Sequence, residues 1–136
     1  MDISSDLIEI VKSSKREALR LLKDRGELMP VGLVLRSEGK IESFQPRGLA
    51  PMVALVEVVK YLRDAATHES TVAVAWCNPL PVAGQLDTTM ELFEIHAESP
   101  RSVTSETVGF RRRLLLGWRE EHSAHFPYAK HNFYVS

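Results

Sequence analysis

Apolar residues near the start of the chain recur every three or four positions, which is the spacing of one face of an α-helix. The stripe consists of Leu7, Val11, Ser14, Ala18 and Leu21 or Leu22. We predict a helix over residues 4–25 that stops at Gly26. Because the stripe is narrow and is interrupted by polar residues, we expect this helix to lie on a surface or against a partner.

A second helical pattern covers residues 50–66, with Pro51 in its first turn, where the missing N–H costs nothing. Its widest apolar face consists of Met52, Leu55, Val56, Val59, Leu62 and Ala66. The valines lower its intrinsic helix propensity, so burial must hold it. We expect a core helix packed on a sheet through that face.

Alternating or continuous apolar runs predict the strands. Residues 31–44 indicate a β-hairpin with a turn at Ser37–Gly39. Residues 70–78 are apolar on both faces, which is typical of a central strand. Residues 86–98 change phase between Leu92 and Phe93, so we expect a β-bulge there.

The pattern over residues 103–121 fits more than one structure. Phe110, Leu114 and Trp118 align on a helix as well as on a strand. We favour one strand, or two strands bent near the arginines, over a helix. The tail "HNFYVS" at 131–136 is a further candidate for a short strand.

This order, α-β-β-α-β-β-β with an optional last strand, predicts an α+β fold. Short turns between successive strands give a mostly antiparallel sheet of about five or six strands with two helices. The length of 136 residues suits a single domain over residues 1–136.

Composition narrows the classes of function. The chain has 44% hydrophobic and 26% charged residues and a net charge of −1, which is typical of a globular protein. Nucleic-acid binders usually carry a basic surplus, so we expect no nucleic acid partner, and no membrane partner either. Nothing in the sequence calls for a cofactor. The single cysteine and the absence of a signal-peptide pattern favour a cytoplasmic protein.

Three stretches carry a resemblance to known proteins. The hairpin "PVGLVLRSEGKIESF" and the strands "TVAVAWCN" and "TTMELFEIHAE" resemble those of small bacterial α+β proteins that have no established activity. The element order also resembles that of profilin-like and roadblock-like domains. The resemblance covers residues 28–119 and implies a fold without implying catalytic residues.

Three residues could support an enzyme or a ligand-binding pocket between the sheet and a helix. Cys77 is a potential nucleophile, and Glu94 and His96 share one face of a neighbouring strand. The competing interpretation is a buried structural thiol beside a solvated row of carboxylates. We therefore expect a protein that is not an enzyme, with these residues as the alternative.

A metal site is a weaker hypothesis that rests on His122, His125 and His131. Zinc needs three or four converging ligands, and a spacing of three sends His122 and His125 to opposite faces of a strand. Exposed histidines on an edge strand are the more ordinary interpretation, and we expect no metal.

The remaining candidates concern binding. They are Arg111, Arg112, Arg113, Trp118, Phe126 and Tyr128, a basic run followed by aromatic residues. Arginines grip carboxylates or phosphates, and aromatic clusters are common in interfaces. We therefore favour a binding or protein-interaction module, which forms a homodimer or binds another protein through its first helix or its last strands.

Overall fold

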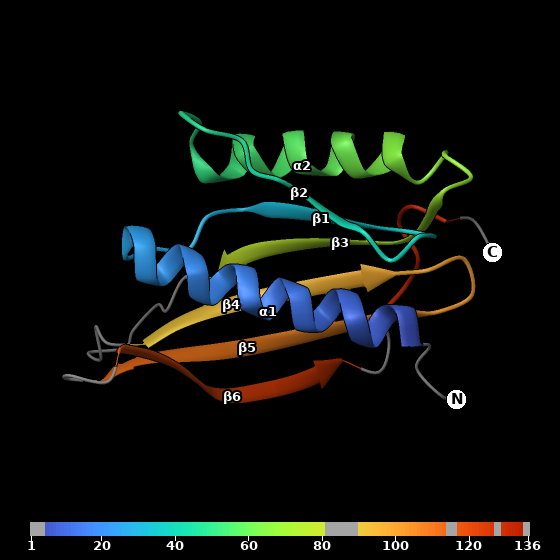
Figure 1. The fold of residues 1–136 in the computed structure, drawn as a ribbon. Helices are drawn as coiled ribbons and strands as arrows, with labels where there is room; N and C mark the ends of the chain where they lie inside the picture. Colours follow the sequence, from blue (N-terminus) through green and yellow to red (C-terminus); the bar gives the residue numbers. More distant parts are fainter. Residues whose placement is uncertain (1–4, 81–89, 114–116, 127–128, 135–136) are drawn as a thin grey trace.

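The structure, a computed structural model, describes residues 5–80, 90–113, 117–126 and 129–134. Its elements are α1 (Ser5–Arg25), β1 (Val31–Arg36), β2 (Ile41–Phe44), α2 (Pro51–Ala65), β3 (Thr71–Leu80), β4 (Met90–Glu98), β5 (Val103–Arg113) and β6 (Gly117–Phe126). The strands form one antiparallel sheet in the order β2-β1-β3-β4-β5-β6. The two helices lie on opposite faces of this sheet (Figure 1).

The predicted α+β class and the order of elements are confirmed. The ambiguous region after residue 103 forms two paired strands, β5 and β6, rather than a helix. Residues 131–134 of the tail form no strand. The optional last strand of the prediction is therefore supplied by β6, earlier in the chain than expected.

Helix α1 packs across the middle of the sheet, against all strands from β3 to β6 and against β1. It buries Leu7, Ile10, Val11, Ala18 and Leu22 in the larger of two hydrophobic clusters, and Leu21 is buried as well. The expectation of a surface helix was wrong, because Ser14 does not interrupt the face. Its hydroxyl donates to the carbonyl of Ile10 at 2.8 Å, so the serine is satisfied inside the helix while fully buried.

Helix α2 covers the other face of the sheet, over β1 and β3. It buries Ala54, Val58, Leu62 and Ala65. The predicted packing face was wrong for Met52 and Val56, which point outward with 84% and 52% of their surface exposed. Gly32 of β1 explains the choice, since a Cβ atom there would lie 3.0 Å from Cγ1 of Val58. The helix approaches the strand closely at this glycine, through Val58 and Leu62.

The expected bulge in β4 is absent. The β3–β4 and β4–β5 ladders run without a register shift, and the irregularities lie instead at Leu35/Arg36 and Gly109/Phe110. Phe93, Ile95 and Ala97 face α1, while Met90 and Leu92 are half-buried on the opposite face. Strand β4 thus has apolar residues on both faces, and no bulge is needed to bury them.

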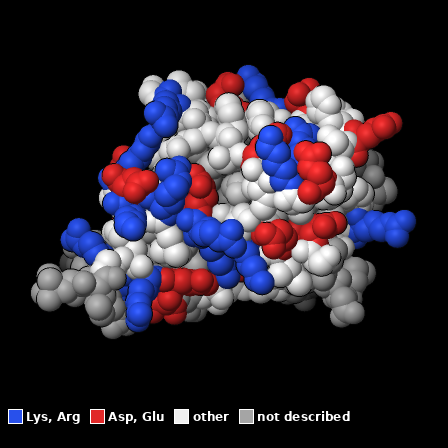
Figure 2. Space-filling model, in the orientation of Figure 1, with Lys and Arg blue, Asp and Glu red and all other residues white. Residues whose placement is uncertain are grey.

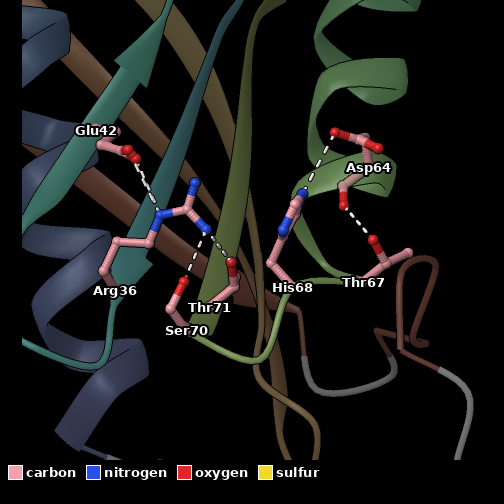
Figure 3. Close-up of polar contacts among 7 residues, drawn as sticks. All are labelled: Arg36, Glu42, Asp64, Thr67, His68, Ser70 and Thr71. Atoms are coloured by element: carbon pink, nitrogen blue, oxygen red, sulfur yellow. Dashed lines mark hydrogen bonds and ion pairs between the residues drawn. The ribbon is translucent and has the colours of Figure 1, made fainter.

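Polar contacts close the end of the sheet where β1, β2 and β3 meet (Figure 3). The Arg36 guanidinium donates to Glu42 Oε1 at 2.9 Å and to Thr71 Oγ1 at 2.5 Å. The Thr67 hydroxyl donates to the Asp64 carbonyl at 2.7 Å, just after α2. These contacts fix the connection that brings the chain from α2 back into the sheet.

Neither helix in the described part of the chain has the length and apolar content that a bilayer crossing requires.

Candidate functional site

The three candidate catalytic residues do not converge. In the β3–β4 register Trp76 lies opposite His96, and Cys77 lies opposite Ile95. Cys77 and His96 therefore point to opposite faces of the sheet. Cys77 is fully buried on the α1 side, where burial raises the pKa of its thiol to about 12 despite a contact with Ser14. A thiol held neutral in this way is no nucleophile.

Glu94 lies on the same face of β4 as His96 but is not the carboxylate with which His96 pairs. It is half-buried, opposite Asn78 on β3 and Thr107 on β5. His96 has a different partner, since its Nε2 lies 2.6 Å from Oε2 of Glu98, and both side chains are buried. The structure thus pairs His96 with a carboxylate two residues further on, which the sequence analysis did not select.

Glu98 anchors the last described segment of the chain. Its carboxylate accepts hydrogen bonds from the backbone N–H groups of Asn132 at 2.6 Å, Phe133 at 3.0 Å and Tyr134 at 3.3 Å. Burial raises the pKa of this carboxyl group, but the bonds from His96 and from the three N–H groups outweigh burial and hold the pKa below its usual range. Both carboxylate oxygens are occupied, which suits a structural anchor and not an acid or base.

The anchored segment covers the sheet beside α2. The rings of His96 and Trp76 are stacked with their centroids 5.3 Å apart, and the Phe133 ring lies 6.4 Å from that of His96. Phe133 and Tyr134 also pack against the cluster that includes Val58 and Val74. The aromatic tail therefore closes the second core. The sequence signal was the tail's aromatic content, but nothing in it indicated Glu98 as the binding partner.

The described histidines of the metal hypothesis have separate partners. Nδ1 of His125 lies 3.2 Å from the Thr104 hydroxyl. Nε2 of His131 lies 3.0 Å from the carbonyl oxygen of Ser99 and 3.2 Å from that of Ser102. The side chain of His122 lies outside the described part of the structure. Within that part, no group of three potential ligands is close enough to hold a metal ion.

The arginine run divides between the two faces of β5. Arg111 donates to Oε2 of Glu121 at 2.7 Å, on the face away from α1. Arg112 lies on the α1 face but is exposed, with its guanidinium carbon 6.0 Å from the centre of the Trp118 ring. The side chains of Arg113 and Phe126, and all of Tyr128, lie outside the described residues. The binding candidates that the structure brings together are therefore Arg112 and Trp118.

The outer side of α2 carries an apolar surface, and the sequence analysis placed two of its residues, Met52 and Val56, on the core side. The α2 surface patch consists of Leu49, Met52, Val53 and Val56, which are 38%, 84%, 49% and 52% exposed. Residues 48–56 contain no charged side chain. No labelled helix or strand lies on the side of α2 away from the sheet (Figure 1). The hydrophobic pattern predicted that Met52 and Val56 are buried, but the sheet does not cover them.

These features define an α+β domain with a helix on each face of one antiparallel sheet. The chain matches no protein family, and neither the curated proteins nor the solved structures contain a significant match.

Proposed function

We propose that the protein is a non-enzymatic interaction module that forms a homodimer through the α2 surface patch. The observation that carries this proposal is the exposure of Met52, Val53 and Val56 on a helix whose opposite side is already buried. In its first two turns α2 is apolar on both sides, which is typical of a segment covered on both sides. Contiguous exposed apolar surface of this kind marks association sites in soluble proteins.

The chemistry of the patch favours a second copy of the chain as its occupant. Between Arg47 and Glu57 the sequence has no charge to match, so the complementary surface must also be apolar and uncharged. A second α2 provides such a surface. In a two-fold dimer the two helices cross antiparallel, Met52 of one copy packs against Val56 of the other, and the helix dipoles oppose each other favourably.

Two of the other candidates considered from the sequence have less support. Helix α1, the first candidate for a contact, already contributes its apolar face to the core. The alternative function was a pocket that uses Cys77, Glu94 and His96. It has less support, because Cys77 lies on the opposite face of the sheet and His96 pairs with Glu98.

A matched pair of variants tests the proposal. Met52→Glu places a carboxylate in the patch, and Ile8→Glu places one at an equally apolar, 45% exposed position in the first turns of α1. An acidic residue near a helix N-terminus is well tolerated, so both variants should fold. Light scattering coupled to size exclusion should give a dimer for the wild type and for Ile8→Glu, and a monomer for Met52→Glu.

A dimer that survives Met52→Glu, or one that Ile8→Glu also dissociates, contradicts this interface. A wild-type monomer that binds a foreign protein or lipid vesicles through the patch contradicts the choice of a second copy as the occupant.

A further inference from the structure

A cleft lies between the end of α1 and the paired ends of β5 and β6, on the face of the sheet away from α2. Its volume is about 610 Å³, within the range of small-molecule sites. The described residues that line it are Leu19, Leu22, Lys23, Gly26, Arg112, Gly117 and Trp118. We call it the α1–β6 cleft.

The lining combines two cations with apolar side chains. Lys23 and Arg112 are its charged residues, and the described lining includes no carboxylate. Neither cation has a carboxylate partner among the residues that the structure describes. At this end of the molecule Figure 2 shows Lys and Arg side chains beside uncharged surface, with Asp and Glu side chains also nearby. The charges of the cleft are therefore open to a ligand.

A third lysine binds two carboxylates of the neighbouring strands. On the same face of the sheet, Lys15 of α1 binds Glu106 of β5 at 3.4 Å and Glu120 of β6 at 3.0 Å. These two acids share the single charge of Lys15, and neither of them pairs with Lys23 or Arg112. The two cations of the cleft therefore lie beside a separate cluster of one lysine and two carboxylates.

Trp118 gives the cleft a flat apolar wall. It is half-buried against the α1 side of the core, next to Leu19. It faces Arg112 across the β5–β6 ladder, and the guanidinium lies 6.0 Å from its ring centre. An arginine held near an indole ring is oriented for a planar carboxylate while its charge remains available.

We propose that the α1–β6 cleft binds a small amphipathic carboxylate. The carboxylate lies between the Lys23 ammonium and the Arg112 guanidinium, and a flat apolar group packs on Trp118 and Leu22. This site is independent of the α2 surface patch, because it lies on the other face of the sheet.

Titration with 2-naphthoate, followed by calorimetry and tryptophan fluorescence, tests the site. We expect saturable binding to the wild type, weakened by about tenfold in Arg112→Gln and in Lys23→Gln, because each variant removes one charged contact. Arg119→Gln is the matched control, since Arg119 is an exposed arginine of β6 on the opposite face. It should bind 2-naphthoate as the wild type does.

Ligand controls separate the two parts of the proposal. The neutral 2-naphthylmethanol tests the requirement for the anion, and inorganic phosphate tests the requirement for the apolar group; both should bind far more weakly. Equal binding of either ligand overturns the corresponding part. Wild-type protein that shows no saturable binding at millimolar 2-naphthoate, or an Arg119→Gln variant as weak as Arg112→Gln, overturns the site.

Discussion

Glu98 determines the local structure more than any candidate selected from the sequence. A fully buried carboxylate is costly unless every charge-bearing oxygen is satisfied. Here His96 and the backbone N–H groups of Asn132, Phe133 and Tyr134 satisfy both oxygens. One side chain thereby joins β4 to a segment that lies far along the chain.

Replacing Glu98 should destabilise the fold strongly. Glu98→Gln keeps the shape but removes the charge and presents an amide donor to N–H groups that need an acceptor. We expect the free energy of unfolding to fall by about 3 kcal/mol in urea titrations. Glu94→Gln, on the same face of the same strand but half-buried, should stay within about 0.5 kcal/mol of the wild type. Equal effects of the two variants contradict the anchor.

The same carboxylate predicts a dependence of stability on pH. The pKa of Glu98 is lower in the folded protein than in the unfolded chain, so the unfolded state binds the proton more readily. The contribution is fully present above the unfolded value of about 4.3 and is lost as the pH falls through the folded pKa. Urea midpoints of the wild type should therefore approach those of Glu98→Gln in acid. Parallel profiles from neutral to acid pH are the contradicting outcome.

The sequence could predict the environment of Cys77 but not that of Glu98. A cysteine within a run of small apolar residues is ordinarily buried, and Cys77 is. Glu98 ends a strand beside a turn, where a carboxylate is usually solvated. Its burial depends on contacts with Asn132 and its neighbours, and no local pattern encodes a contact over that separation.

At the scale of elements, periodicity located both helices and the buried face of α1, but only part of the buried face of α2. The narrow stripe of α1 became the main core contact once Ser14 bonded to Ile10. Only part of the wide apolar stripe of α2 packs on the sheet, because the close packing at Gly32 determines which side of the helix faces β1. Val58 and Leu62 lie over Gly32, whereas Met52 points outward. A hydrophobic pattern predicts which residues tend to be buried. The distance at which the helix packs on the sheet determines which of these residues the sheet buries.

The close approach of α2 to β1 can be tested at Gly32. In Gly32→Ala the new methyl group would lie 3.0 Å from Val58 Cγ1 and 3.2 Å from Leu62 Cδ2, both fully buried. We expect a loss of about 1–3 kcal/mol in unfolding free energy from overpacking. Val58→Ala removes the obstructing methyl groups. The double variant should be less destabilised than the two losses added together, by about 1 kcal/mol. Strict additivity contradicts the contact.

At the scale of the whole molecule, the order of elements was the most predictable feature. Short turns join β1 to β2 and β4 to β5, and local turn chemistry of this kind specifies antiparallel pairing. The pairing of β1 with β3 across α2, and the return of the tail to the sheet, depend on contacts between distant segments. In the resulting fold the apolar face of α1 is buried and one face of α2 is uncovered. A cleft with two basic residues lies at the end of α1.

The uncovered face of α2 carries the central claim, which is that the working form of this module is a homodimer. Sedimentation equilibrium of the unmodified chain tests it most directly, with the concentration varied through the tens of micromolar. We expect the average mass to rise with concentration toward twice that of one chain. A mass that stays at one chain across the whole range contradicts the claim.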